Sequence, residues 1–112
     1  MENRERLFVY GTLQEPEIQQ KIFGRKTAGL PDTLPGYRKS EVIIDDDKYL
    51  AIVPSAESGV DGFVLTITPS ELKLIDDYET ASYKRLDLTL QSGKHAWVYV
   101  KASRILIPSA TR

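Results

Sequence analysis

Apolar residues along the chain fall into short runs that are typical of β-strands rather than of long helices. The first run, Leu7-Phe8-Val9-Tyr10, is bulky and aromatic, as strand residues often are, and it breaks at Gly11. Near the C-terminus, Leu86, Leu88 and Leu90 alternate with polar residues, as expected for a half-buried strand. The segments that we expect to be strands are residues 6–10, 42–44, 49–53, 59–68, 83–91 and 94–101.

Turn residues separate several of these runs. The segment Leu34-Pro35-Gly36-Tyr37 combines proline with glycine and is a turn signal. Residues 45–48, Asp-Asp-Asp-Lys, separate two expected strands and predict a hairpin with a four-residue polar loop. A second hairpin is expected around Gln91-Ser92-Gly93-Lys94, and the apolar stretch 96–100 that follows is expected to be buried on both faces.

Two segments have the signals of short helices. In residues 15–24, Pro16 suits a first helical turn, Ile18 and Ile22 share one face, and Gly24 is placed to end the helix. We expect this helix to cover one end of the core.

The second helix has the clearer start. Thr68-Pro69-Ser70-Glu71 is a capping box with proline at the first helical position. Leu72 and Ile75 then point together toward the core. Asp76 and Asp77 lie where the helix should end, which is unfavourable against the negative end of the helix dipole. This conflict indicates that residues 76–79 serve something besides helix stability.

Strands outnumber helices and do not alternate with them regularly, which argues against a doubly wound parallel sheet. We predict one α+β, mostly β, domain over residues 1–112, with about six or seven strands and two short helices. A small mixed β-barrel would remove exposed strand edges, although the periodicity equally permits an open sheet. Residues 104–112 contain Ile105-Leu106-Ile107, which either add an edge strand or pack onto the core.

Charge and composition argue against several classes of function. With 15 basic and 16 acidic residues, the chain has no basic excess for binding nucleic acid. It has no cysteine and one histidine, His95, which argues against thiol chemistry and a zinc centre. No apolar run approaches the roughly 18 residues of a spanning helix, and the charged N-terminus is unlike a secretory signal. We therefore expect a cytoplasmic protein that does not bind membranes.

The break after the first strand is a candidate binding site. Gly11 permits backbone conformations that other residues resist, and the amides of Gly11, Thr12 and Leu13 come directly before the first expected helix. Such amides can form a nest for an anion such as a carboxylate. Tyr10 ends the strand beside them.

Tyr10-Gly11-Thr12-Leu13 resembles the YGTL signature of the gamma-glutamylcyclotransferase-like (AIG2-like) family. A second match follows in the order expected for that family. Leu74-Ile75-Asp76-Asp77-Tyr78-Glu79 corresponds to its LDxYE stretch, and Tyr83-Lys84-Arg85 corresponds to the following YxR. Two separated matches in order are much more specific than one. The resemblance spans about residues 7–101.

The resemblance implies a small β-barrel enzyme that cyclises a γ-glutamyl group to 5-oxoproline and releases an amine or amino acid, without a cofactor or a metal. It implies Glu79 as general acid/base and residues 10–13 as the cradle for the substrate's α-carboxylate. Tyr83 and Tyr99 are further candidates to bind the γ-glutamyl substrate. Which compound is the substrate, and the oligomeric state, are left open.

Three further expectations concern the side chains around this site. The pKa of Glu79 should be raised if Tyr78 or another aromatic residue partly buries it. Arg85 should pair with an acidic residue rather than contact substrate. Strict alternation puts Tyr83 and Arg85 on the face opposite Leu86 and Leu88, but the sequence does not say which face is interior.

Two rival functions use the same scaffold. One is a binding module that captures a γ-glutamyl or amino-acid-like ligand without turning it over. The other is a structural or regulatory interaction protein. The presence of Glu79 favours the enzyme, because an added negative charge gains little for a protein that only binds a carboxylate.

Overall fold

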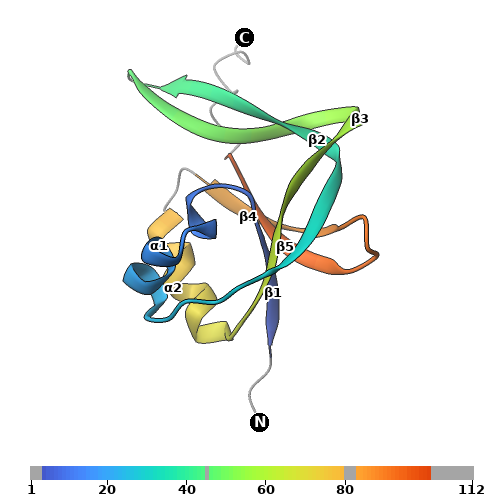
Figure 1. Ribbon diagram of the computed structural model, residues 1–112. Helices are drawn as coiled ribbons and strands as arrows, with labels where there is room; N and C mark the ends of the chain where they lie inside the picture. Colours follow the sequence, from blue (N-terminus) through green and yellow to red (C-terminus); the bar gives the residue numbers. More distant parts are fainter. Residues whose placement is uncertain (1–3, 45, 80–82, 102–112) are drawn as a thin grey trace.

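The computed structural model describes residues 4–44, 46–79 and 83–101, arranged as five strands, two α-helices and one 3-10 helix (Figure 1). In chain order the elements are β1 (Glu5–Val9), η1 (Thr12–Gln14), α1 (Pro16–Phe23), β2 (Leu30–Ile44), β3 (Asp47–Ile67), α2 (Pro69–Glu79), β4 (Tyr83–Thr89) and β5 (His95–Lys101).

The strands form one curled sheet in the order β2-β3-β1-β5-β4. The hairpin partners β2 and β3, and likewise β4 and β5, are antiparallel, whereas the central strand β1 runs antiparallel to β3 and parallel to β5. Beyond β4, the amide of Gln91 donates to the carbonyl of Thr33 on β2 at 2.8 Å, which draws the two outer strands together. The mostly β, barrel-like fold with two short helices is therefore confirmed.

The described residues contain five strands rather than six or seven, because β2 and β3 each join segments that the sequence separates. The predicted turn at residues 34–37 is a bulge inside β2, where the register shifts between Pro35 and Tyr37 and Gly36 takes a φ of 85°. The predicted four-residue loop is also wrong, since Asp47 already pairs with Ile44. The expectation for residues 104–112 lies outside the described residues.

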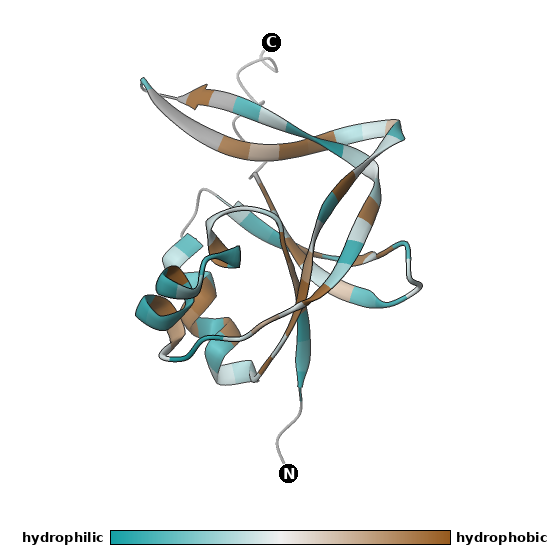
Figure 2. Ribbon diagram, viewed as in Figure 1, coloured by the Kyte–Doolittle hydropathy of each residue, from teal (hydrophilic) through white to brown (hydrophobic). Residues whose placement is uncertain are grey.

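Alternation along the central strands gives the sheet two apolar faces. On β1 and directly after it, Phe8 and Tyr10 point to the interior of the curl, whereas Leu7 and Val9 point to the helices. β5 does the same with Val98 inside and Tyr99 toward the helices. Both helices lie on this second face, and Figure 2 shows that each carries apolar as well as polar segments. The stretch 96–100 is buried as expected, except that Trp97 is partly exposed.

Both helices begin as their sequences predict, and α1 also ends as predicted, whereas α2 continues to Glu79, past Asp76 and Asp77 where its end was expected. Pro16 occupies the first turn of α1, and Gly24, with a φ of 80°, ends it by donating its amide to the carbonyl of Gln20 at 3.0 Å. At the start of α2 the Thr68 amide donates to Glu71 Oε1 at 2.9 Å, and the Glu71 amide donates to Thr68 Oγ1 at 3.1 Å. The capping box is thus confirmed.

No helix in the described ranges is long and apolar enough to cross a membrane. The cytoplasmic location remains a prediction.

Candidate functional site

The C-terminal half of α2 faces β4 and β5 through a polar network centred on Asp76. Its carboxylate accepts hydrogen bonds from Arg85 Nε at 2.7 Å, from Arg85 Nη2 at 2.9 Å and from the Tyr99 hydroxyl at 2.5 Å. Burial alone would raise the pKa of Asp76, but these bonds and the charge of Arg85 hold that pKa below its usual value. Asp76 is therefore ionised at neutral pH.

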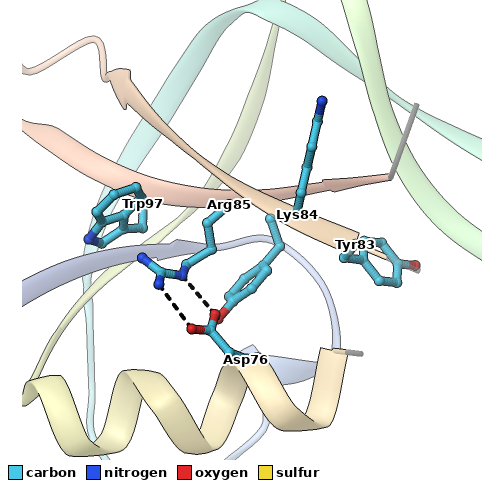
Figure 3. A pocket seen from close by; sticks show the side chains of 6 residues that line it. Asp76, Tyr83, Lys84, Arg85 and Trp97 are labelled. Carbon is cyan, nitrogen blue, oxygen red and sulfur yellow. Dashed lines mark hydrogen bonds and ion pairs between the residues drawn. The ribbon is translucent and has the colours of Figure 1, made fainter. Parts of the chain in front are cut away.

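Arg85 is held in place by more than its ion pair. Its guanidinium lies over the ring of Trp97, 4.3 Å from the ring centroid, and the Trp97 indole donates to Glu5 on β1 at 3.0 Å. Figure 3 shows Arg85 and Asp76 pointing toward one another with Trp97 beside the guanidinium. The expectation that Arg85 pairs with an acidic residue is confirmed.

An open pocket of about 350 Å³ lies beside this network. The residues that line it are Asp76, Tyr83, Lys84, Arg85, Trp97 and Tyr99. Tyr83 and Arg85 therefore lie on the helix side of the sheet, whereas Leu86 and Leu88 pack in the interior. The sequence did not say which face of β4 is interior, and the structure shows that it is the face of Leu86 and Leu88.

Glu79 is the last residue of α2 and is partly buried. Burial, followed by the negative charge of Asp76, raises the pKa of Glu79 from its ordinary 4.5 to about 7. The expectation of a raised pKa is thus confirmed. Tyr78, the aromatic residue next to Glu79 in sequence, is 47% exposed. The charge of Glu79 raises the pKa of two aromatic residues nearby, Tyr10 and Tyr99.

Each of the three candidate tyrosines donates its hydroxyl to a hydrogen bond. The buried Tyr10 donates its hydroxyl to the carbonyl of Tyr99 at 2.5 Å, so β1 is linked to β5 just before the glycine loop. Tyr83 donates to the carbonyl of Leu50 on β3 at 2.9 Å. Burial raises the pKa of both Tyr10 and Tyr99, and the nearby charges of Glu79 and, at Tyr99, of Asp76 raise it further. Both tyrosines therefore stay protonated.

The loop after Tyr10 is braced by two glutamine side chains. Gln14 Nε2 donates to the Gly11 carbonyl at 3.1 Å, and the buried Gln19 Nε2 donates to the Leu13 carbonyl at 2.8 Å. Thr12 is exposed, whereas the Leu13 side chain is part of the core. The amides of Thr12 and Leu13 lie in the first turn of η1, where a helix has no acceptor of its own for them. Any ligand would meet the backbone of this loop rather than the Leu13 side chain.

Leu50 is a neighbour of the loop that the sequence analysis missed. A Cβ atom placed on Gly11 would lie 3.2 Å from Leu50 Cδ2, and the carbonyl of the same leucine accepts the Tyr83 hydroxyl. The β2–β3 hairpin thus contacts both the glycine loop and β4. No local signal marks Leu50, because the contact depends on how the long hairpin bends.

Asp76 was also missed as a site residue, although its unfavourable place at a helix end was a signal. Among the residues that the structure describes, no group of three or more histidine, cysteine, aspartate or glutamate side chains could hold a metal ion.

Glu79 should make the stability of the protein depend on pH. Because its pKa is about 7 when folded and 4.5 ordinarily, the folded state binds more protons between these values. The stability that comes from protonated Glu79 is fully present below the lower value and is lost as the pH rises through the higher one. We expect Glu79→Gln, which stays neutral, to gain in thermal midpoint over the wild type between about pH 5 and about pH 8. A difference that stays constant across this range would contradict the raised pKa.

Comparison with known proteins places the chain among relatives. Residues 7–111 match the family described as gamma-glutamyl cyclotransferase, AIG2-like. AIG2-like protein C of Arabidopsis thaliana is 36% identical over 80 residues, which cover 70% of this chain and 45% of that protein. AIG2-like protein B of the same plant is 35% identical over 81 residues, covering 71% of this chain and 46% of that protein. The chain thus spans less than half the length of these two relatives.

Two solved structures share the fold. The solution structure of an Arabidopsis thaliana protein aligns with a TM-score of 0.74 and 25% identity, covering 93% of this chain and 68% of that one. A solved gamma-glutamyl cyclotransferase aligns with a TM-score of 0.73 and 16% identity, covering 89% of this chain and 68% of that one. The second likeness concerns the fold alone.

Proposed function

Because the chain belongs to the gamma-glutamyl cyclotransferase, AIG2-like family, we propose that it cyclises a γ-glutamyl group to 5-oxoproline and releases an amine or amino acid. The observation that carries the proposal is the raised pKa of Glu79, about 7, near Tyr10, which directly follows β1, and Tyr99 on β5. A general base works best when its pKa lies near the working pH. An ordinary exposed glutamate would be a much weaker base.

In the proposed reaction the substrate's α-amine attacks its own γ-carbonyl carbon. A new carbon–nitrogen bond closes the five-membered ring, and the bond to the departing nitrogen breaks. Glu79 takes a proton from the attacking amine and returns one to the departing nitrogen, so that protons balance and the enzyme ends as it began. No cofactor is required.

The proposal assigns substrate binding to the loop after β1. The amides of Gly11, Thr12 and Leu13 would hold the α-carboxylate, while Tyr83 and Tyr99 would contact the γ-glutamyl part. Support for this comes from the electrostatic influence of Glu79 on Tyr10, the residue directly before the loop. Since nucleophile and electrophile belong to one molecule, holding them in the reactive geometry contributes about 7 to 11 kcal/mol in favourable systems.

The direct test is to incubate the protein with a panel of γ-glutamyl amino acids and γ-glutamyl amines and to measure 5-oxoproline. We expect at least one compound to be cyclised, with equimolar release of its amine. α-Glutamyl compounds serve as the control. Their amine or amino acid is bonded to the α-carbonyl, so attack at the γ-carbon would not release it. Saturable binding of γ-glutamyl compounds without any product would establish the binding module instead.

A further inference from the structure

Asp76 is held by donors from two different strands. Arg85 on β4 binds both of its oxygens, and Tyr99 on β5 binds one of them. An acidic residue near the C-terminal end of a helix is unfavourable against the helix dipole. The bonds to the two strands therefore explain why an aspartate is tolerated at this position, whereas helix stability does not.

Asp76 and Glu79 are three residues apart on α2, and side chains at this spacing are neighbours on one helix face. The negative charge of Asp76 follows burial as a cause of the raised pKa of Glu79. The negative charge of Asp76 acts on Glu79 in this way although Asp76 is paired with Arg85. The same carboxylate thus docks the helix and acts on the proposed base.

Other ionisable groups surround this pair of carboxyls. They are Lys73 on α2, Tyr83 and Arg85 on β4, Tyr99 on β5, Glu5 on β1, and Tyr10 directly after β1. Of these, Arg85, Tyr99 and Lys73 favour the charged form of Asp76. Tyr10 and Tyr99 stay protonated, because burial raises the pKa of each.

We propose that Asp76 is a positioning residue for the general base: clamped by Arg85 and Tyr99, it docks the last turn of α2 on the sheet and fixes a negative charge one helical turn before Glu79. This inference rests on the base role proposed for Glu79. In this role Asp76 and Arg85 act on the reaction through Glu79 and do not need to contact the substrate.

The test is Asp76→Asn, which keeps the shape of the side chain and removes its charge. We expect carboxylate NMR to show the pKa of Glu79 lowered by about one unit in this variant. The acid limb of the pH profile of kcat/KM should move to lower pH by the same amount. The NMR measurement needs no substrate. It therefore tests the effect of Asp76 on Glu79 even if the protein turns over no γ-glutamyl compound.

Asp77→Asn is the matched control. Asp77 is the next residue of α2 and is exposed. Its replacement by asparagine changes the net charge by the same amount. We expect it to leave the pKa of Glu79 and the pH profile nearly unchanged, since an exposed charge is screened by water and salt. Equal shifts in Asp76→Asn and Asp77→Asn would overturn the special role of Asp76.

Arg85→Gln separates the effect of charge from loosening of the helix end. It removes one of the two donors to Asp76 but leaves the Tyr99 hydrogen bond that holds the helix end and the carboxylate itself, so the pKa of Glu79 should stay at or above its wild-type value. If the helix end merely loosens and exposes Glu79, this pKa falls toward the ordinary value in both variants. A fall in Arg85→Gln equal to that in Asp76→Asn, or no fall in Asp76→Asn, would overturn the proposal.

Discussion

Replacing Glu79 by glutamine is expected to lower kcat for γ-glutamyl cyclisation by about 10²- to 10⁴-fold, the usual contribution of a positioned acid or base. Glutamine has the same shape but cannot accept the proton of the attacking amine at neutral pH. KM should change little, because the proposed carboxylate cradle at Gly11–Leu13 is untouched. The measurement is the initial rate of 5-oxoproline formation, with the best substrate of the panel, in the two proteins.

Glu17→Gln is the control for this experiment. Glu17 lies exposed in the first turn of α1, and its replacement makes the same chemical change away from the proposed site. We expect wild-type kcat in this variant. Retention of most of the wild-type kcat in Glu79→Gln would assign the proton transfer to another group, and comparable losses in the two variants would point to a nonspecific effect of charge.

Gly62→Ala is expected to destabilise the protein by about 3 kcal/mol or more, the upper end of the usual cost of overpacking. A Cβ atom on Gly62 would lie 2.3 Å from the carbonyl oxygen of Val9 and 2.8 Å from Phe8 Cζ. The Val9 oxygen is main chain in the central strand, so it cannot move aside without disturbing the pairing of β1 with β3. In a domain of this size the thermal midpoint should fall by roughly 10 to 20 °C.

Gly59→Ala provides the matched comparison on the same strand. There the new Cβ would meet the Thr33 Cγ2 methyl at 3.0 Å and the Leu34 carbonyl at 3.7 Å. A threonine side chain can rotate by a small amount, so the change in the free energy of unfolding should stay within about 1 kcal/mol. Similar midpoints for the Gly62 and Gly59 variants would show that β1 yields more easily than the close contact suggests.

Features decided by neighbouring residues were predictable from the sequence. The capping box at Thr68, the end of α1 at Gly24 and the alternation of Leu86, Leu88 and Leu90 each depend on contacts within a few residues. Burial and the charge of Asp76 then bear out the expected pKa of Glu79. The catalytic role of Glu79 and the binding roles of residues 10–13, Tyr83 and Tyr99 stay predictions.

Features decided by pairing between distant segments were not predictable. A proline–glycine step is equally compatible with a turn and with a bulge, and only the partner strand β3 makes Gly36 a bulge. Leu50 lies close to Gly11, 39 positions away by the numbering, only because the β2–β3 hairpin bends over the glycine loop. The face occupied by Tyr83 likewise depends on where the helices pack, which alternation within one strand does not determine.

The parallel pairing of β1 with β5 also bears on the order in which the molecule can assemble. Leu7 and Phe8 pair with Trp97 and Val98, so strands from near the start and near the end of the described chain lie side by side in the middle of the sheet. Closing so long a loop is entropically costly and slows folding. During synthesis, β1 can pair with β3 well before β5 leaves the ribosome. Tyr99 then arrives last, and with it the hydroxyl that secures Asp76, so the proposed catalytic apparatus matures only after nearly the whole described sequence has been translated.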